Sequence, residues 1–446
     1  MKNIIEKASA RGATRSEVYG LTSLRTEVSF EANRLKGVSR TEERGFALRV
    51  VKDGRMGFAT STKFDDPDGL ADAAVATAEF GDEAAFGFAG PAHMPEIGPS
   101  DERVKGLEVD DMMGRPRDAI ARLLDYDQEI LCDSETTREI QTISVATSDG
   151  LEASFERTLY QFGVDGRLID GTSILDCGGY YGGTALDSDG QKLVSRVIED
   201  LKNGRKNVDV TGGPTTVLFT PNAVADIFMT LHYGVSGSIV ERGISPLAGK
   251  LGETVFDERV TIHDDGLARN GYASGPFDDE GVPMQRTPVV ERGVLKHFLT
   301  DLRTAAKLRQ PLTGNAGRAR RLVMSKDLGK VPSPEITNWE MSGGDAPHEQ
   351  LVDDMGDGII VDRIMGILMS NLLSGDFSGN VALGYKVQGG KIRGRVKDTM
   401  VAGSIYTLLR DNVVAISSDV ERVGQLGFIG SHRYPYLLMR DVSISA

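Results

Sequence analysis

Cysteine, histidine and tryptophan are scarce in this chain of 446 residues, which has two Cys, six His and one Trp. Cys132 and Cys177 form neither a metal-binding pattern nor a disulfide framework, and two thiols in this length fit a reducing compartment. Basic residues are also few, since 51 Lys and Arg stand against 65 Asp and Glu. The net charge of −14 argues against phosphate neutralisation, so we expect no nucleic-acid partner.

Long apolar runs are missing as well. The N-terminal residues contain no apolar segment of signal-peptide length, and no run reaches the roughly 18 apolar residues that span a bilayer. The best candidate, residues 359–373, is interrupted by Asp362 and Arg363. We therefore expect a cytoplasmic protein with no membrane partner.

The length and the strand pattern predict two domains of α+β class. A chain of this size exceeds one hydrophobic core, and the run Gly212-Gly213-Pro214 is a natural boundary. We expect an N-terminal antiparallel sheet with flanking helices at residues 1–210. Residues 211–446 should form a β-rich domain with helices, because strands and helices do not alternate regularly.

Several local signals predict individual elements. Asp53-Gly54 lies between two apolar stretches and indicates a hairpin. Residues 140–175 fit a three-stranded meander with turns at 148–150 and at Asp165-Gly166. The run from Gly178 to Gly183 has no following Walker lysine, so we interpret it as a turned or flexible linker rather than a phosphate loop. Helices are expected at 189–203 and 222–233.

Two common catalytic patterns fail or are absent. The chain has no GxSxG sequence, which leaves an α/β-hydrolase nucleophile without support. Residues 348–353 spell HExxxD, but Pro347 precedes them and Glu349 suits the positive end of a helix dipole. We interpret that segment as a helix start rather than a metal site.

Other motifs carry a family resemblance along nearly the whole chain. They are GFALRVVKDGRMGFATST at 45–62, FDDEGV at 277–282, PLTGNAG at 311–317 and SGDFSGN at 374–380. The chain resembles the TldD/PmbA peptidase family, also called modulators of DNA gyrase, and its PmbA (TldE) branch in particular. The resemblance implies the two-domain α+β fold of that family.

In the TldD branch an HExxxH motif and a cysteine near the C-terminus hold the metal. Counting back from residues 245–252, that motif falls here on Phe228, Met229 and Tyr233, and residues 423–430 contain no cysteine. His232 precedes the second ligand position by one residue, which turns its side chain by about 100°. The resemblance thus implies no metal, no cofactor and no catalytic residue in this chain, with zinc expected only in a TldD-type partner.

We therefore predict a chamber-forming, non-metal subunit of a TldD/TldE-type metallopeptidase assembly that acts on small or unfolded peptides. Its partner would be an HExxxH-bearing chain or a second copy of itself. Asn315, Asp376 and Ser378 are candidate substrate-binding residues, although turn and capping roles suit them equally. The alternatives are a homodimeric peptide-binding or scaffold protein without protease activity, and an independent hydrolase with an unrecognised site.

Overall fold

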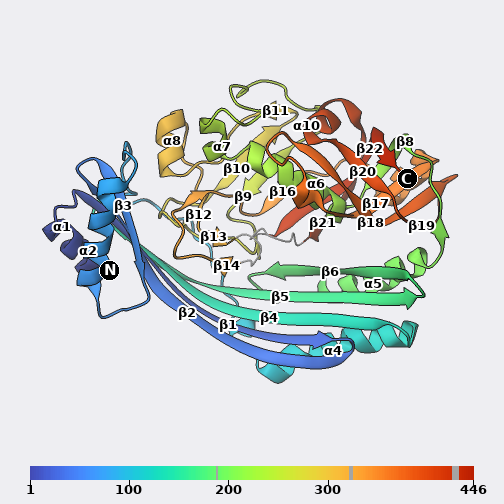
Figure 1. Ribbon diagram of the computed structural model, residues 1–446, viewed down its shortest axis with the longest axis horizontal. Coiled ribbons are helices and arrows are strands. Elements are labelled where there is room, and N and C mark those ends of the chain that lie inside the picture. The colour runs from blue at the N-terminus through green and yellow to red at the C-terminus, as the bar shows by residue number, and fades with distance from the viewer. Residues whose placement is uncertain (187–188, 321–324, 424–430) are drawn as a thin grey trace.

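The N-terminal half of the chain forms one long curved sheet (Figure 1). The computed structural model describes residues 1–186, 189–320, 325–423 and 431–446. The elements of this half are α1 (Lys2–Ala10), β1 (Arg15–Glu31), β2 (Arg34–Lys52), β3 (Arg55–Ser61), α2 (Pro67–Thr77), η1 (Ala78–Phe80), α3 (Glu102–Lys105), α4 (Val109–Tyr126), β4 (Leu131–Thr147), β5 (Glu152–Asp170), β6 (Ser173–Gly183) and α5 (Asp189–Gly204). The sheet has the antiparallel order β3-β2-β1-β4-β5-β6, which leaves β6 at one edge.

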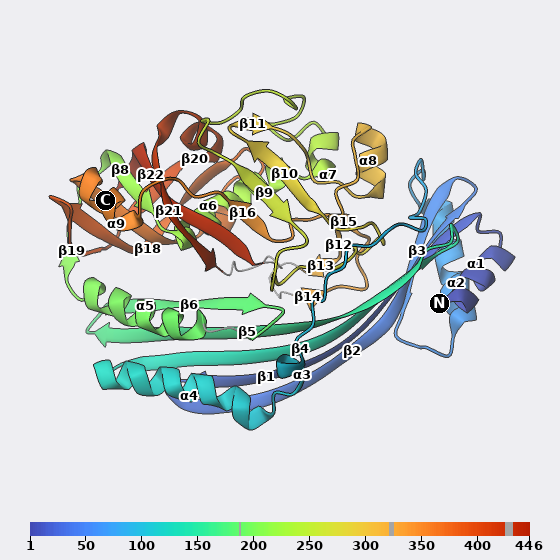
Figure 2. The same cartoon turned by 180° about the vertical axis from the view of Figure 1, so that it is seen from behind.

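The two faces of this sheet differ because side chains alternate along a strand. Helices α4 and α5 cover one face, where Leu123, Val197 and Leu201 fill the space beside Gly166. Cys132 and Cys177 flank Gly166 in register on the neighbouring strands, and both are buried. Two strand spacings, about 10 Å, separate them, which is beyond the reach of a disulfide. The other face is turned towards the second half of the chain (Figures 1 and 2).

Local signals predicted part of this half correctly. The hairpin between β2 and β3 turns at Asp53 and Gly54, with φ of 51° and 77° as a type I′ turn requires. The meander is present, but its second turn lies after Asp170, because β5 continues through Asp165 and Gly166. The glycine-rich linker prediction was wrong, since the run from Gly178 to Gly183 belongs to β6 and pairs with β5.

The C-terminal half is built on a larger mixed sheet with helices around it. Its elements are β7 (Asn207–Val208), β8 (Gly213–Phe219), α6 (Pro221–Gly234), α7 (Gly237–Glu241), β9 (Ile262–Asp265), β10 (Arg286–Glu291), β11 (Val294–Leu295), α8 (Leu302–Leu308), β12 (Ala316–Gly317), β13 (Ala319–Arg320), β14 (Ser325–Lys326), β15 (Ser333–Pro334), β16 (Trp339–Met341), α9 (His348–Met355), β17 (Gly358–Met365), η2 (Ile367–Met369), β18 (Asp376–Gln388), β19 (Lys391–Val396), β20 (Met400–Ser404), α10 (Ile405–Thr407), η3 (Leu408–Asn412), β21 (Val413–Val423) and β22 (His432–Ser445). The α+β prediction is thereby confirmed. Among the described residues, no helix combines the length and apolar character needed to cross a membrane.

Strand β8 and helix α6 organise the centre of this half. β8 pairs with β22 in antiparallel and with β17 in parallel fashion. The chain then enters α6 at Pro221, whose fixed φ suits the first position of a helix. Most of α6 is buried in the larger hydrophobic core, so the helix predicted at 222–233 is held by packing against that core.

A buried ionic network holds the two halves together at one end. Arg49 of β2 donates to Glu17 of β1 at 2.9 Å and to Glu280 of the C-terminal half at 2.7 Å. Arg318 lies over the ring of Tyr19, with 4.8 Å between its guanidinium carbon and the ring centroid. These contacts fix the C-terminal half above the sheet and leave space between them further along.

Candidate functional site

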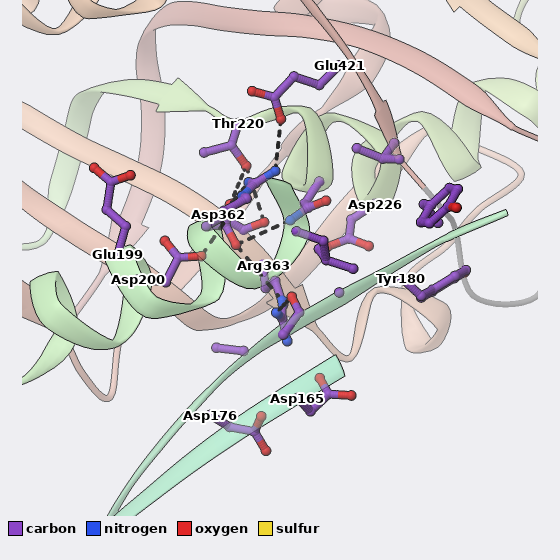
Figure 3. Close-up of a pocket in the computed structure, with 18 of the residues that line it drawn as sticks. Asp165, Asp176, Tyr180, Glu199, Asp200, Thr220, Asp226, Asp362, Arg363 and Glu421 are labelled. Atoms are coloured by element: carbon purple, nitrogen blue, oxygen red, sulfur yellow. Dashed lines mark hydrogen bonds and ion pairs between the residues drawn. The ribbon is translucent and has the colours of Figure 1, made fainter. Parts of the chain in front are cut away.

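A large cavity lies between the open face of the N-terminal sheet and the C-terminal half (Figure 3). Its volume is about 2310 Å³, and its walls come from β1, β4, β5, β6, α5, α6, β17, η2 and β21. Among the described residues that line it, fourteen are acidic and seven are Lys or Arg. The cavity is therefore electronegative.

The sheet side of the cavity carries acids at alternate positions. Asp133 and Glu135 project from β4, and Asp165 of β5 pairs directly with Asp133 across the sheet. Burial raises the pKa of Asp165 to about 6, although Arg363 opposes the shift and Asp176 adds to it. Glu135 is accessible from the cavity, but partial desolvation and then the charge of Glu27 raise its pKa too.

Helix α6 presents one face to this cavity and the other to the core. Asn222, Asp226 and Met229 lie at helical spacing and line the cavity. Burial raises the pKa of Asp226 to about 7, against the effect of a 3.0 Å hydrogen bond from the Ile364 backbone N–H. Asp226 is thus a carboxyl group that titrates near neutral pH at the cavity wall.

Arg196 of α5 is the centre of a group of polar contacts at the cavity wall, and Figure 3 labels its partners Asp362 and Glu421. It donates to Asp362 of β17 at 2.6 Å and to Glu421 of β21 at 3.0 Å. Thr220 also donates to Asp362, at 2.8 Å. Burial alone would raise the pKa of Asp362, but Arg196 and then Arg363 bring it below its usual value.

A second carboxyl group beside this network is less well compensated. Asp200 of α5 accepts a 2.9 Å hydrogen bond from the Tyr385 hydroxyl. Burial and the charge of Asp362 raise the pKa of Asp200 to about 7, and Arg196, whose Nε lies 3.9 Å away, reduces the shift only in part. Asp200 and Asp226 are therefore both poised to exchange protons near neutral pH.

The three positions assigned to the lost metal motif do not converge. Phe228 is fully buried and packs on Tyr434, with 5.2 Å between ring centroids, whereas Met229 faces the cavity. Tyr233 is half-buried at the end of α6, five residues and about 140° around the helix axis from Phe228. His232 is buried on the core side against Trp339. Because Phe and Met offer no suitable ligand, these positions do not fit a zinc ion.

The three candidate substrate-binding residues lie apart from one another. Asn315 is buried and donates to Asp264 at 2.6 Å and to the Glu335 carbonyl at 3.0 Å. Asp376 and Ser378 are exposed on β18, where Asp376 accepts a hydrogen bond from Ser374. Neither Asn315 nor the β18 pair is among the described residues of the large cavity.

One group of side chains within the described ranges could gather round a metal ion. The ligand atoms of His348, Glu349 and Asp419 lie within 4.8 Å of one another. Asp419, however, accepts hydrogen bonds from the His348 backbone N–H at 2.7 Å and from its ring at 3.0 Å. These bonds fix the start of α9, so the prediction of a helix start at His348 is confirmed. The HExxxD aspartate, Asp353, is not part of the group.

The acidic sheet face was not foreseen from the sequence. A signal did exist, because Asp133 and Glu135 are spaced by two within a predicted strand region. Their meeting with Asp165 depends on register between strands, which no local pattern supplies. The predicted absence of a C-terminal cysteine concerns residues 423–430, of which 424–430 lie outside the described residues.

Comparisons with known proteins agree with the fold. The model of the PmbA/TldA metallopeptidase C-terminal domain matches residues 212–446, over half of the chain, and that of PmbA/TldA metallopeptidase domain 1 matches 16–78. The chain belongs to the PmbA/TldA metallopeptidase family, as its motifs predicted.

Individual relatives support the same assignment. A metalloprotease of Methanothermobacter thermautotrophicus is 25% identical over 93% of this chain and 90% of its own length. Metalloprotease PmbA of Escherichia coli O157:H7 is 30% identical over 46% of this chain and 41% of its own. The crystal structure of TldE from Thermococcus kodakarensis covers all of both chains, with a TM-score of 0.90 at 20% identity, and so shares the fold.

Proposed function

We propose that this chain is the non-metal subunit of a cytoplasmic two-chain peptidase of the TldD/TldE type. One observation carries the proposal: a cavity of about 2310 Å³ borders the helix that should hold the metal motif, yet that helix offers Phe228 and Met229. In this proposal the chain forms part of the chamber wall and binds the peptide. The partner supplies zinc, its ligands and the general base.

The edge position of β6 supports a role in holding extended peptides. β6 pairs with β5 on one side and is the last strand of its sheet, and its residues Gly178 to Tyr181 line the cavity. An unfolded peptide can add to such an edge through its backbone, which is independent of sequence. Small or unfolded peptides are therefore the proposed substrates.

The test is reconstitution with an HExxxH-bearing member of the family. We expect the isolated chain to contain no stoichiometric zinc and to cleave no unfolded peptide. Mixed with the partner, it should form a stable complex whose chelator-sensitive peptidase activity exceeds that of the partner alone. Elemental analysis, size-exclusion chromatography with light scattering and a fluorogenic peptide assay measure these properties.

The other outcomes separate the alternatives. Chelator-insensitive cleavage by the isolated chain would support an independent hydrolase and overturn the proposal. A homodimer that binds peptide but neither associates with nor stimulates the partner would support the scaffold alternative.

A further inference from the structure

We propose that the cavity selects peptides that carry Lys or Arg, and that the cationic side chain binds in a slot, defined as the part of the cavity lined by Glu135, Asp165 and Tyr180. The inference rests on the proposed peptide chamber and names the class of peptide that it accepts. Nothing in the motifs or the family resemblance specifies a charge preference.

The slot is formed by the register of three strands. Glu135 of β4, Gly163 of β5 and Tyr180 of β6 lie side by side in one row across the sheet. A Cβ atom at Gly163 would approach the Glu135 Cγ to 3.3 Å and the Tyr180 Cβ to 3.5 Å. The Glu135 side chain therefore lies over Gly163 next to Tyr180, and Asp165 stands two residues along on the same face.

Tyr180 provides an observation that is independent of the acids. Its hydroxyl is buried and has no hydrogen-bond partner among the described residues. Buried polar groups normally have such partners, because an unsatisfied one costs free energy. Burial and then the charge of Asp226 raise the pKa of Tyr180, and Glu135 adds to the shift, so carboxylates lie near this phenol. A Lys ammonium has three donors and can therefore serve the phenol oxygen and a neighbouring carboxylate together.

The negative charge at the slot is only partly balanced by this chain. Arg167 lies 3.2 Å from Asp176 and 3.7 Å from Asp133 and compensates that end of the acidic face. For Glu135 and Asp165, no ion pair is found within the described part of the chain, although Arg25 acts on Glu135 and Arg363 on Asp165 at longer range. Asp133 and Asp165 are also directly opposed, which is unfavourable for like charges. A cationic ligand would neutralise the unpaired carboxylates and reduce the repulsion between Asp133 and Asp165.

The arrangement suits a peptide cation better than a metal ion or an anion. An anion would meet a cavity in which acidic residues outnumber Lys and Arg by two to one. A metal ion needs several ligand atoms converging on one point, and neither Glu135 nor Asp165 belongs to a converging group among the described residues. An extended peptide instead places every second side chain on the same face, matching the pleat of the acidic sheet.

The experiment compares binding of three labelled peptides to the isolated full chain by fluorescence anisotropy. The peptides share an unstructured background with blocked termini and carry several Lys, several Gln or several Glu residues. We expect the Lys peptide to bind about tenfold more tightly than the Gln peptide at low salt, with the difference shrinking as salt rises.

Matched variants locate the effect. Glu135→Gln/Asp165→Asn should abolish the preference for Lys while binding of the Gln peptide is retained. Glu6→Gln/Asp82→Asn removes the same charge from exposed positions outside the cavity and should leave the preference intact. Tyr180→Phe should weaken Lys-peptide binding alone. Because Glu135 and Asp165 have raised pKa values, their amides should fold at least as stably, which a thermal melt checks.

Two outcomes of the binding experiment would contradict the proposal at different levels. Equal binding of Lys and Gln peptides, or an equal loss in both double variants, would overturn the charge preference while leaving the peptide chamber in place. Failure to bind any of the three peptides would overturn the proposed peptide-binding function itself.

Discussion

The buried ionic network and the large cavity are two acid-rich regions between the same halves of this protein. They differ in how far their acidic side chains are paired with cations. In the ionic network, Glu17, Arg49 and Glu280 are almost completely buried, and the guanidinium contacts both carboxylates directly. In the cavity, Asp165 and Asp226 are lining residues, and no ion pair within the described ranges neutralises them. The network is closed and paired, whereas the cavity is open and short of cations.

This difference in charge pairing indicates a structural role for the ionic network and a binding role for the cavity. A buried charge without a partner is strongly destabilising, so the closed network must be complete for the halves to hold together. The cavity has more acidic than basic lining residues, although packing of the fold does not require this excess. The excess lies where a ligand can enter. Unfavourable electrostatics in an accessible cleft is the feature expected of a binding site.

The largest expected effect comes from breaking the closed network. Arg49→Met leaves Glu280 without its cation in the interior and leaves Glu17 only the 3.6 Å contact with Arg318, which should lower the free energy of unfolding by about 3–5 kcal/mol. Arg410→Met removes an exposed Arg that pairs with Asp411 and should leave the free energy of unfolding almost unchanged, because exposed ion pairs are screened by water and salt. Urea denaturation measures both. Similar costs for the two variants would mean that the network does not anchor the halves.

The two faces of α6 should also differ. Phe228→Ala opens a hole against Tyr434 in the core and should cost about 3–5 kcal/mol. Met229→Ala removes a side chain of the same core that also borders the cavity, so it should cost less, about 2–3 kcal/mol. Thermal and chemical denaturation distinguish them. If Met229→Ala proved as damaging as Phe228→Ala, the assignment of the cavity face would be wrong.

Helix α6 and the β2–β3 hairpin could be predicted because their signals are local. Pro221 starts the helix, and its apolar residues specify it whatever surrounds it. Asp53-Gly54 likewise supplies the positive φ values of its turn. The family motifs predicted the overall fold, which the signals for single helices and strands could not predict.

Strand β6 could not be predicted because its stability is not local. Glycine disfavours strands, and the run from Gly178 to Gly183 is a strand only through its pairing with β5. The acidic slot depends on that same pairing, since Tyr180 reaches Glu135 only across Gly163. The candidate substrate-binding residues Asn315 and Asp376 were chosen for their polarity alone, and neither is among the described residues that line the cavity.

Titration of the cavity acids should make stability fall as the pH rises. Asp226 has an ordinary pKa of 3.8 and a folded value of about 7, so the unfolded chain releases its proton first. The resulting cost is absent below about pH 4, grows between about pH 4 and pH 7, and is constant above. Asp226→Asn should therefore raise the free energy of unfolding by about 1–3 kcal/mol at pH 8 and leave it unchanged near pH 4.

The matched control for this pH series is Asp82→Asn at an exposed position, which should give parallel curves for variant and parent. Denaturation at a series of pH values measures the effect. A stability gain of the Asp226 variant that persists near pH 4 would show that packing, rather than charge, is responsible.

The smallest effect concerns the opposed pair on the sheet. Asp133→Asn removes the repulsion of Asp165 but keeps a side-chain oxygen that can accept the 2.8 Å hydrogen bond from the Ala32 N–H. It also loses a weak 3.7 Å contact with Arg167, so the net gain at pH 8 should be about 0.2–1 kcal/mol. Near pH 4 Asp165 is protonated, because its pKa is about 6, and the gain should vanish. Asp170→Asn, opposite the neutral Ser173, should give no gain at either pH. A loss of stability in Asp133→Asn at pH 8 would mean that Arg167 already balances this face, and that the cavity is not short of cations at that end.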